Sequence, residues 1–159
     1  WVAEAAKPNN IGGLLNSTAT TIMVGDNQLN RQVRGILSFN TGAGLPDKAV
    51  IINVTLKVRK HSATGAGNPV AALQGFMVDI KRGMFGKSTL EVSDFQTAAN
   101  KTYGPFNSGL TNNWYSFDLT NGSAYINQMA TNGSLTQIRL RFKLDDNNNS
   151  KADILFNNQ

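Results

Sequence analysis

Period-two alternation of apolar and polar residues is the feature of this sequence that most constrains its fold. The longest example spans residues 49–60, whose alternating apolar residues are Val50, Ile52, Val54, Leu56 and Val58. Shorter examples occupy residues 33–39, 76–81, 114–119 and 138–144. Because successive side chains of a strand point to opposite faces of its sheet, each segment is predicted to be a strand with one buried and one exposed face.

The segments between these predicted strands are rich in glycine, asparagine and proline, as in residues 42–47 and 65–69, which favours tight turns. Short helices are predicted from Ser93, with Gln96 completing a capping box, and over residues 123–129. Several half-buried strands with short connections predict an all-β fold, a jelly-roll-like antiparallel β-sandwich with one or two short helices in loops. A closed barrel is the alternative. Residues 1–159 are expected to form a single domain.

The composition excludes several kinds of chemistry. The chain has 159 residues, no cysteine and one histidine, His61. Disulfides, thiolate catalysis, cysteine-ligated metals and multi-histidine metal sites are therefore excluded. His61 lies in a polar run and is expected to be an exposed loop residue, so we predict no catalytic residues and no enzyme. A glycosidase pair drawn from the ten carboxylates is the alternative. The apolar runs are too short for a membrane span.

A resemblance to a known family arises from residues 30–40, which read Asn-Arg-Gln-Val-Arg-Gly-Ile-Leu-Ser-Phe-Asn, and from the Gly-Leu-Pro turn at 44–46 that precedes the long predicted strand. Residues 113–120 and 139–142 continue the pattern. Over residues 1–156 the chain resembles the DNRLRE domain family. The resemblance implies a jelly-roll-like β-sandwich of secreted bacterial and archaeal proteins, some of whose relatives bind acidic polysaccharides such as alginate. It implies no catalytic residues.

The basic residues are the first candidate binding site. Alternation places Lys57 and Arg59 on the polar face of one strand, and Arg139, Arg141 and Lys143 on that of another. If the two strands are neighbours, these residues form a cationic platform for uronate or sulfate groups. Otherwise they solubilise the outer faces of a sandwich. Nucleic acid is not expected as a partner, because exposed aromatic residues for base stacking are not evident.

Residues 145–153 are the second candidate site. Asp145, Asn147, Asn149 and Asp153 have the spacing of oxygen ligands in a Ca²⁺-binding loop. Ser150, however, stands where such a loop needs glycine, and a phenylalanine stands where the bidentate glutamate belongs. An asparagine-rich hairpin loop without metal is the alternative, so we predict either no cofactor or Ca²⁺.

Asparagine is unusually abundant, with 20 residues against 10 acidic ones. Six asparagines lie in Asn-x-Ser/Thr sequons and are candidate glycosylation sites: Asn16, Asn53, Asn100, Asn121, Asn132 and Asn148. The alternative is that asparagine simply favours turns. A polar, turn-rich chain without cysteine is typical of secreted prokaryotic proteins, so an extracellular or cell-surface location is expected.

Two other residues invite a prediction. Arg34 lies between apolar neighbours, where a partly buried guanidinium needs a carboxylate or carbonyl groups, so a structural role is expected. Trp114 is expected to pack in the core rather than to stack on sugar rings.

These patterns lead to two hypotheses of function. The first is a non-catalytic extracellular module that attaches to matrix polysaccharide, with acidic glycans as partners, or to a cell surface. The second is a self-associating structural subunit of an extracellular fibre or sheath, joined by β-strand donation. The second requires that the sandwich lack its final closing strand, which either the remainder of a longer protein or residues 1–6 of a neighbouring subunit would replace. The alternative is that residues 153–156 already complete the sheet.

Overall fold

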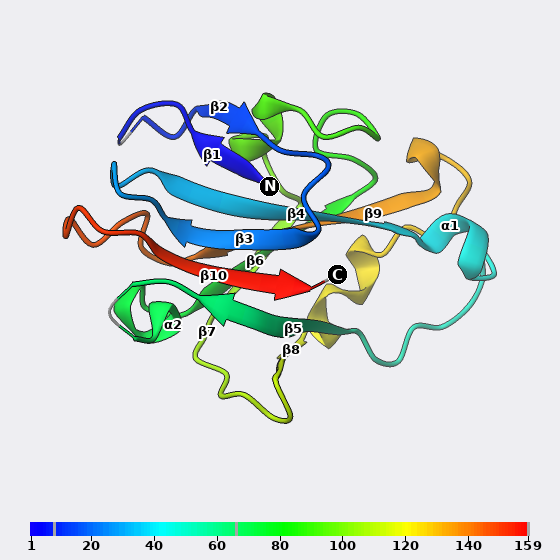
Figure 1. Cartoon of the computed structure of the whole chain (residues 1–159). Helices are drawn as coiled ribbons and strands as arrows, with labels where there is room; N and C mark the ends of the chain where they lie inside the picture. Colours follow the sequence, from blue (N-terminus) through cyan, green and yellow to red (C-terminus); the bar gives the residue numbers. More distant parts are fainter. Residues whose placement is uncertain (8, 66, 159) are drawn as a thin grey trace.

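The computed structural model describes residues 1–7, 9–65 and 67–158, and it consists almost entirely of antiparallel strands (Figure 1). The strands are β1 (Val2–Glu4), β2 (Gly12–Leu15), β3 (Thr21–Asp26), β4 (Gln32–Asn40), β5 (Thr55–Ala63), β6 (Phe76–Arg82), β7 (Lys101–Phe106), β8 (Trp114–Asp118), β9 (Leu135–Phe142) and β10 (Asp153–Asn158). The helices are α1 (Thr41–Gly44), α2 (Pro69–Ala72) and the 3₁₀ turns η1 (Val92–Phe95), η2 (Thr120–Tyr125) and η3 (Asn132–Ser134). The prediction of an all-β antiparallel sandwich is confirmed.

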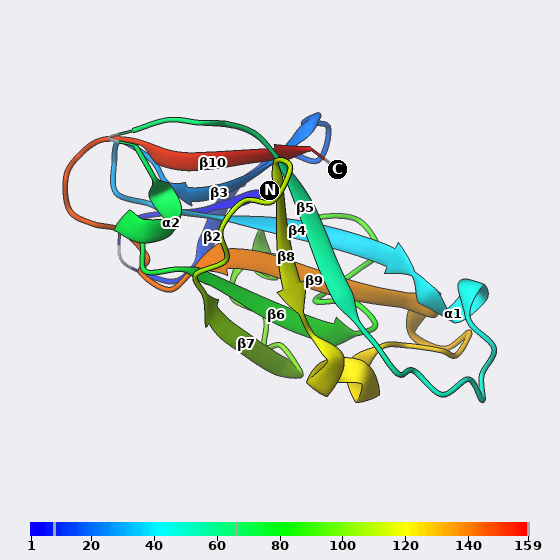
Figure 2. The ribbon, with the colours of Figure 1, turned by 90° about the horizontal axis from the view of Figure 1, so that it is seen from below.

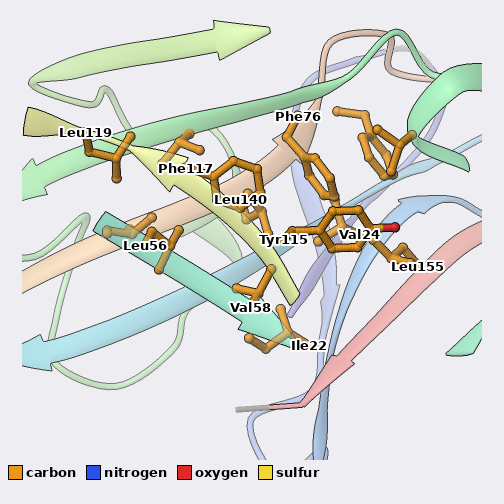
Figure 3. Close-up of a cluster of buried hydrophobic side chains, with 14 of the residues drawn as sticks. Ile22, Val24, Leu56, Val58, Phe76, Tyr115, Phe117, Leu119, Leu140 and Leu155 are labelled. Carbon is orange, nitrogen blue, oxygen red and sulfur yellow. The ribbon is translucent and has the colours of Figure 1, made fainter. Parts of the chain in front are cut away.

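The strands are hydrogen-bonded in the order β7-β6-β9-β4-β3-β10-β5-β8, and this path folds over to form two layers (Figures 1 and 2). One layer contains β7, β6, β9 and β4, and the other contains β3, β10, β5 and β8. The core lies between them. Phe76 of β6 is its centre, with ring centroids 5.0 Å from those of both Tyr115 and Phe117 of β8 (Figure 3). β1 pairs with β4, and β2 pairs with β1.

A strand was predicted over residues 49–60, but in the structure the corresponding strand, β5, begins only at Thr55. Val50 and Ile52 are 85% and 84% exposed rather than buried. Leu56 and Val58, which share their parity, do face the core. The alternation is correct for the part of the segment that has a neighbouring strand. Residues 50–53 have none, and a strand without a hydrogen-bond partner is not stable.

The two ends of the described chain are paired inside the sheet. β10 lies between β3 and β5 and is hydrogen-bonded to both, so residues 153–156 are paired inside the sheet. β1 is paired with β2 on one side and β4 on the other, and Val2 is fully buried. The fibre hypothesis required an unpaired edge near residues 153–156 and a free donor strand at residues 1–6. In the structure, β10 and β1 are both paired with other strands of the same chain.

The short helices differ in detail from their predictions. η1 begins at Val92, and its capping box joins Glu91 and Asp94 rather than Ser93 and Gln96, with the Glu91 amide donating to Asp94 Oδ2 at 2.9 Å. A charged carboxylate accepts stronger hydrogen bonds from the N-terminal amides of a helix than the neutral side-chain amide of a glutamine does. Among the described residues, no helix has the length and apolar character needed to cross a membrane.

Candidate functional site

The predicted basic residues lie on two different outer faces of the sandwich. Lys57 and Arg59 are on β5, whereas Arg139 and Arg141 are on β9. Three strands, β4, β3 and β10, separate β9 from β5 in the sheet. Lys143 is exposed just beyond the end of β9. The condition for a single platform of these five residues, that the two strands are neighbours, is therefore not met, since alternation sets the face of a side chain but not the neighbour of its strand.

Arg139 and Arg141 are held in a structural ion-pair network around Asp79 of β6. Arg139 is only 5% exposed, and its Nε donates to Asp79 Oδ2 at 2.8 Å. The Nε of Arg141 donates to the same oxygen at 3.1 Å. Arg139 Nη1 also donates to the backbone carbonyls of residues 94, 95 and 97 at 2.7, 3.0 and 2.9 Å. The guanidinium of Arg139 is therefore fully bonded within the protein, whereas that of Arg141 shares the same carboxylate with its side chain 21% exposed.

Arg34 joins the same buried layer from β4. Its Nη1 donates to the carbonyl of Phe95, its Nη2 to Asn10 Oδ1 at 2.8 Å and its Nε to Gln32. The guanidinium also lies 3.8 Å from the centroid of the Phe95 ring. Burial, together with the charges of the two other arginines, lowers the pKa of Arg34 to about 10. The prediction that carbonyl groups hold a structural Arg34 is confirmed.

The remaining basic face, on β5 and β8, is open. Arg59 is paired in register with Trp114, and Lys57 with Ser116, and all four are exposed. Trp114 is 41% exposed, so the expectation that it packs in the core is wrong: its neighbour Tyr115 takes the inward parity and is buried. Within the described part of the chain, neither cation forms an ion pair. We call Lys57, Arg59, Trp114 and Ser116 the β5–β8 face.

The predicted calcium loop is closed by its own amides. Asn147 and Asn149 each donate a side-chain N–H to Asp153 Oδ2 at 2.6 Å, while their own oxygens accept backbone amides two residues on. Asp145 accepts from Gln32 Nε2 at 2.9 Å. A Ca²⁺ site needs oxygens, not N–H groups, directed at a common point. Across the described residues no cluster of three or more acidic or histidine side chains is suited to a metal. The oxygens of Asn147 and Asn149 are thus used by the loop itself, and calcium binding at residues 145–153 stays an untested prediction.

Asp26 of β3 is a buried acid that the sequence pattern did not reveal. It is fully buried and stands opposite Asp153 of β10, with its two carboxylate oxygens accepting the backbone amides of Asp153 and Asn147, both at 3.3 Å. Burial raises the pKa of Asp26 to about 6, and the nearby charges of Asp153 and Asp146 act in the same direction. The sequence gives no signal for this pair, because the two residues lie far apart in the chain and meet only across the sheet.

The raised pKa of Asp26 makes stability depend on pH. The carboxyl group of Asp26 binds its proton more tightly in the folded state than in the unfolded chain. The stability of the fold that this group contributes is therefore fully present below the ordinary pKa of 3.8, and it is lost as the pH rises through about 6. We expect the free energy of unfolding to fall across this window by up to about 1.4 kcal/mol per pH unit.

Melting curves recorded across this pH window test the prediction. Asp26→Asn should flatten the dependence, leaving the part due to Asp94, whose pKa burial also raises. Asp47→Asn, which changes an exposed turn residue, should leave the dependence as in the wild type. An unchanged slope in Asp26→Asn would show that Asp26 titrates normally.

The sequons are mostly accessible. Asn53, Asn100, Asn121 and Asn148 are exposed, and Asn16 is half-buried. The side chain of Asn132 lies outside the described part of the structure. Glycosylation at these positions stays a prediction.

No family model, no curated protein and no solved structure matches this chain. The resemblance to the DNRLRE family therefore stays a prediction, and function is argued from the geometry of the β5–β8 face.

Proposed function

We propose that this protein is a non-catalytic extracellular module that attaches to acidic polysaccharide through the β5–β8 face. The observation that carries the proposal is the pairing of Arg59 with Trp114, side by side on neighbouring strands and both exposed. A guanidinium binds a carboxylate or sulfate through two parallel hydrogen bonds. An adjacent indole offers a flat apolar surface with a polar edge, which suits the face of a sugar ring.

The arrangement of the second cation supports a polymeric ligand. Lys57 lies two residues from Arg59 on the same face of β5, a spacing of about 7 Å along a strand. Two cations in a row engage successive acidic groups of one polymer, and linked contacts strengthen one another. The net charge of +5 favours polyanions over neutral glucans. This face has one exposed aromatic residue, whereas proteins that bind single-stranded nucleic acid stack successive bases on several aromatic side chains. The face therefore suits an acidic glycan better than a nucleic acid.

Affinity electrophoresis in gels containing alginate, pectate or a neutral glucan tests this function. We expect the acidic polymers to retard the wild-type protein at low salt, and the retardation to weaken as salt is added, because exposed charges are screened. Arg59→Ala and Trp114→Ala should each lose most of it. Lys101→Ala removes one exposed charge from β7 on the other layer and should retain it.

Two results would contradict the proposal. If no acidic polymer retards the wild-type protein, the module does not bind such glycans. If Lys101→Ala weakens binding as much as Arg59→Ala, attraction depends on net charge and the β5–β8 face is not a site.

A further inference from the structure

The segment of residues 49–54, which we call the unpaired segment, is the most exposed apolar part of the described chain. Val50 and Ile52 exceed every other large apolar side chain in exposure, the next being Leu29 at 62%. Between residues 50 and 53, no backbone N–H or C=O has a hydrogen-bond partner among the described residues. The segment is nevertheless held at both ends, since Ala49 accepts a bond from Gln128 and Val54 from Leu119.

An apolar groove lies beside the unpaired segment, at the end of the sandwich where β4 and β5 are not bridged. β4 pairs only with β9 over residues 36–40, and β5 pairs only with β8 over residues 55–58. The groove has a volume of about 680 Å³. Its apolar wall consists of Phe39, Leu45, Leu56, Leu119, Ile126 and Ile138. The hydroxyls of Thr41 and Thr136 in this wall are 2.7 Å apart and bonded to each other. The groove therefore favours apolar side chains.

The backbone direction of β5 shows which groups of the unpaired segment are available. Val54 uses both its N–H and its C=O toward residues 119–120 of the neighbouring chain segment. Because these groups alternate between the two edges of a strand, Ile51 and Asn53 present theirs to the opposite, open edge once the segment is extended. Val50 and Ile52 share the parity of Leu56, so extension turns them toward the inner face, over the groove.

We propose that the unpaired segment pairs antiparallel with the same segment of a second copy of this chain, so that the two segments lie side by side across a two-fold axis. The segment lies within an uncharged stretch, from Ala49 to Leu56, in a chain of net charge +5. Two positively charged copies therefore approach there with little direct repulsion. Such a contact uses the same patch on both copies and is closed, so it yields a dimer and not a fibre.

One register of this pairing uses the free backbone groups of both copies. With Ile52 opposite Ile52 on the axis, Ile51 and Asn53 of each copy exchange backbone hydrogen bonds with Asn53 and Ile51 of the other. Residues 46–49 form a turn in which the Ala49 amide donates to the Pro46 carbonyl, so the paired stretch in this register ends at residues 50 and 54.

Cysteine cross-linking tests the dimer and its register, because the natural chain has no cysteine. On the axis, the two copies of residue 52 form a non-hydrogen-bonded pair with Cα atoms about 4.5 Å apart, within the range of a disulfide. Ile52→Cys should therefore give a covalent dimer on mild oxidation. Leu29→Cys, at the next most exposed apolar position and outside the segment, should stay monomeric. Equal cross-linking of the two variants, or larger polymers from Ile52→Cys, would overturn the proposal.

Sedimentation equilibrium provides the second, non-covalent measurement. The wild-type chain should show a concentration-dependent monomer–dimer equilibrium, and Ile52→Lys should be monomeric at the same concentrations. Asn53→Pro should also be monomeric, because it removes an N–H that is unpaired in the single chain and donates only in the dimer. Melting temperatures close to that of the wild type would show that both variants fold. If the wild-type chain is monomeric at all concentrations measured, a second copy does not pair with the unpaired segment and the proposal is refuted.

Discussion

Asp79→Asn is expected to lower the free energy of unfolding by about 3–5 kcal/mol, the usual result of removing one partner from a buried ion pair. Asp79 is 1% exposed and is the carboxylate shared by Arg139 and Arg141, and its other oxygen accepts the Thr102 hydroxyl at 2.6 Å. Asparagine preserves the shape of the side chain but leaves a guanidinium charge buried without a counter-charge. Thermal or urea unfolding of the purified variant measures the effect.

The same site predicts an acid limit to stability. Burial alone would raise the pKa of Asp79, but Arg139 and Arg141 outweigh burial, so its pKa lies below the ordinary value of 3.8. The stabilisation is therefore complete above that value and is lost as the pH falls below it. Asp79→Asn should lack this acid loss. Lys87→Gln, which breaks the exposed pair with Glu91, is the control and should leave the melting temperature almost unchanged. An equally small effect of Asp79→Asn would mean that the arginines are hydrated.

Leu140→Asp is expected to prevent folding. Leu140 of β9 has no exposed surface and lies in the core opposite β5 and β8 (Figure 3). The substitution removes apolar contacts worth about 2–5 kcal/mol and buries a carboxylate that has no partner. Together these costs match or exceed the total stability of about 5–15 kcal/mol that is typical of a domain. The circular dichroism spectrum should lose its β-sheet signal, and proteolysis should become rapid.

Thr55→Asp is the matched control for Leu140→Asp. Thr55 carries the outward parity of β5 and is exposed, so the same carboxylate remains in water there. It stands opposite Asp118, a like charge, and a small destabilisation is therefore expected. If the two variants were equally stable, the assignment of inner and outer faces in the two layers would be incorrect.

The direction of side chains was readable from the sequence because it is a local property. Alternation with period two predicted an all-β fold and predicted that Ile138, Leu140 and Phe142 face the core, as they do. It depends only on the geometry of an extended backbone, which any short stretch of sequence carries. The resemblance to the DNRLRE family did not identify any residue of the β5–β8 face.

The neighbours of each strand were decided by the tertiary structure. Arg59 and Arg139 have the same outward parity, yet Arg59 is exposed whereas Arg139 lies beneath residues 85–97 and is paired with Asp79. The unpaired segment has a strand-forming sequence but no strand beside it. Asp26 meets Asp153 only because β3 and β10 are adjacent. Burial, pairing and pKa depend on contacts between residues distant in the chain, and a local pattern carries no information about which strands become neighbours.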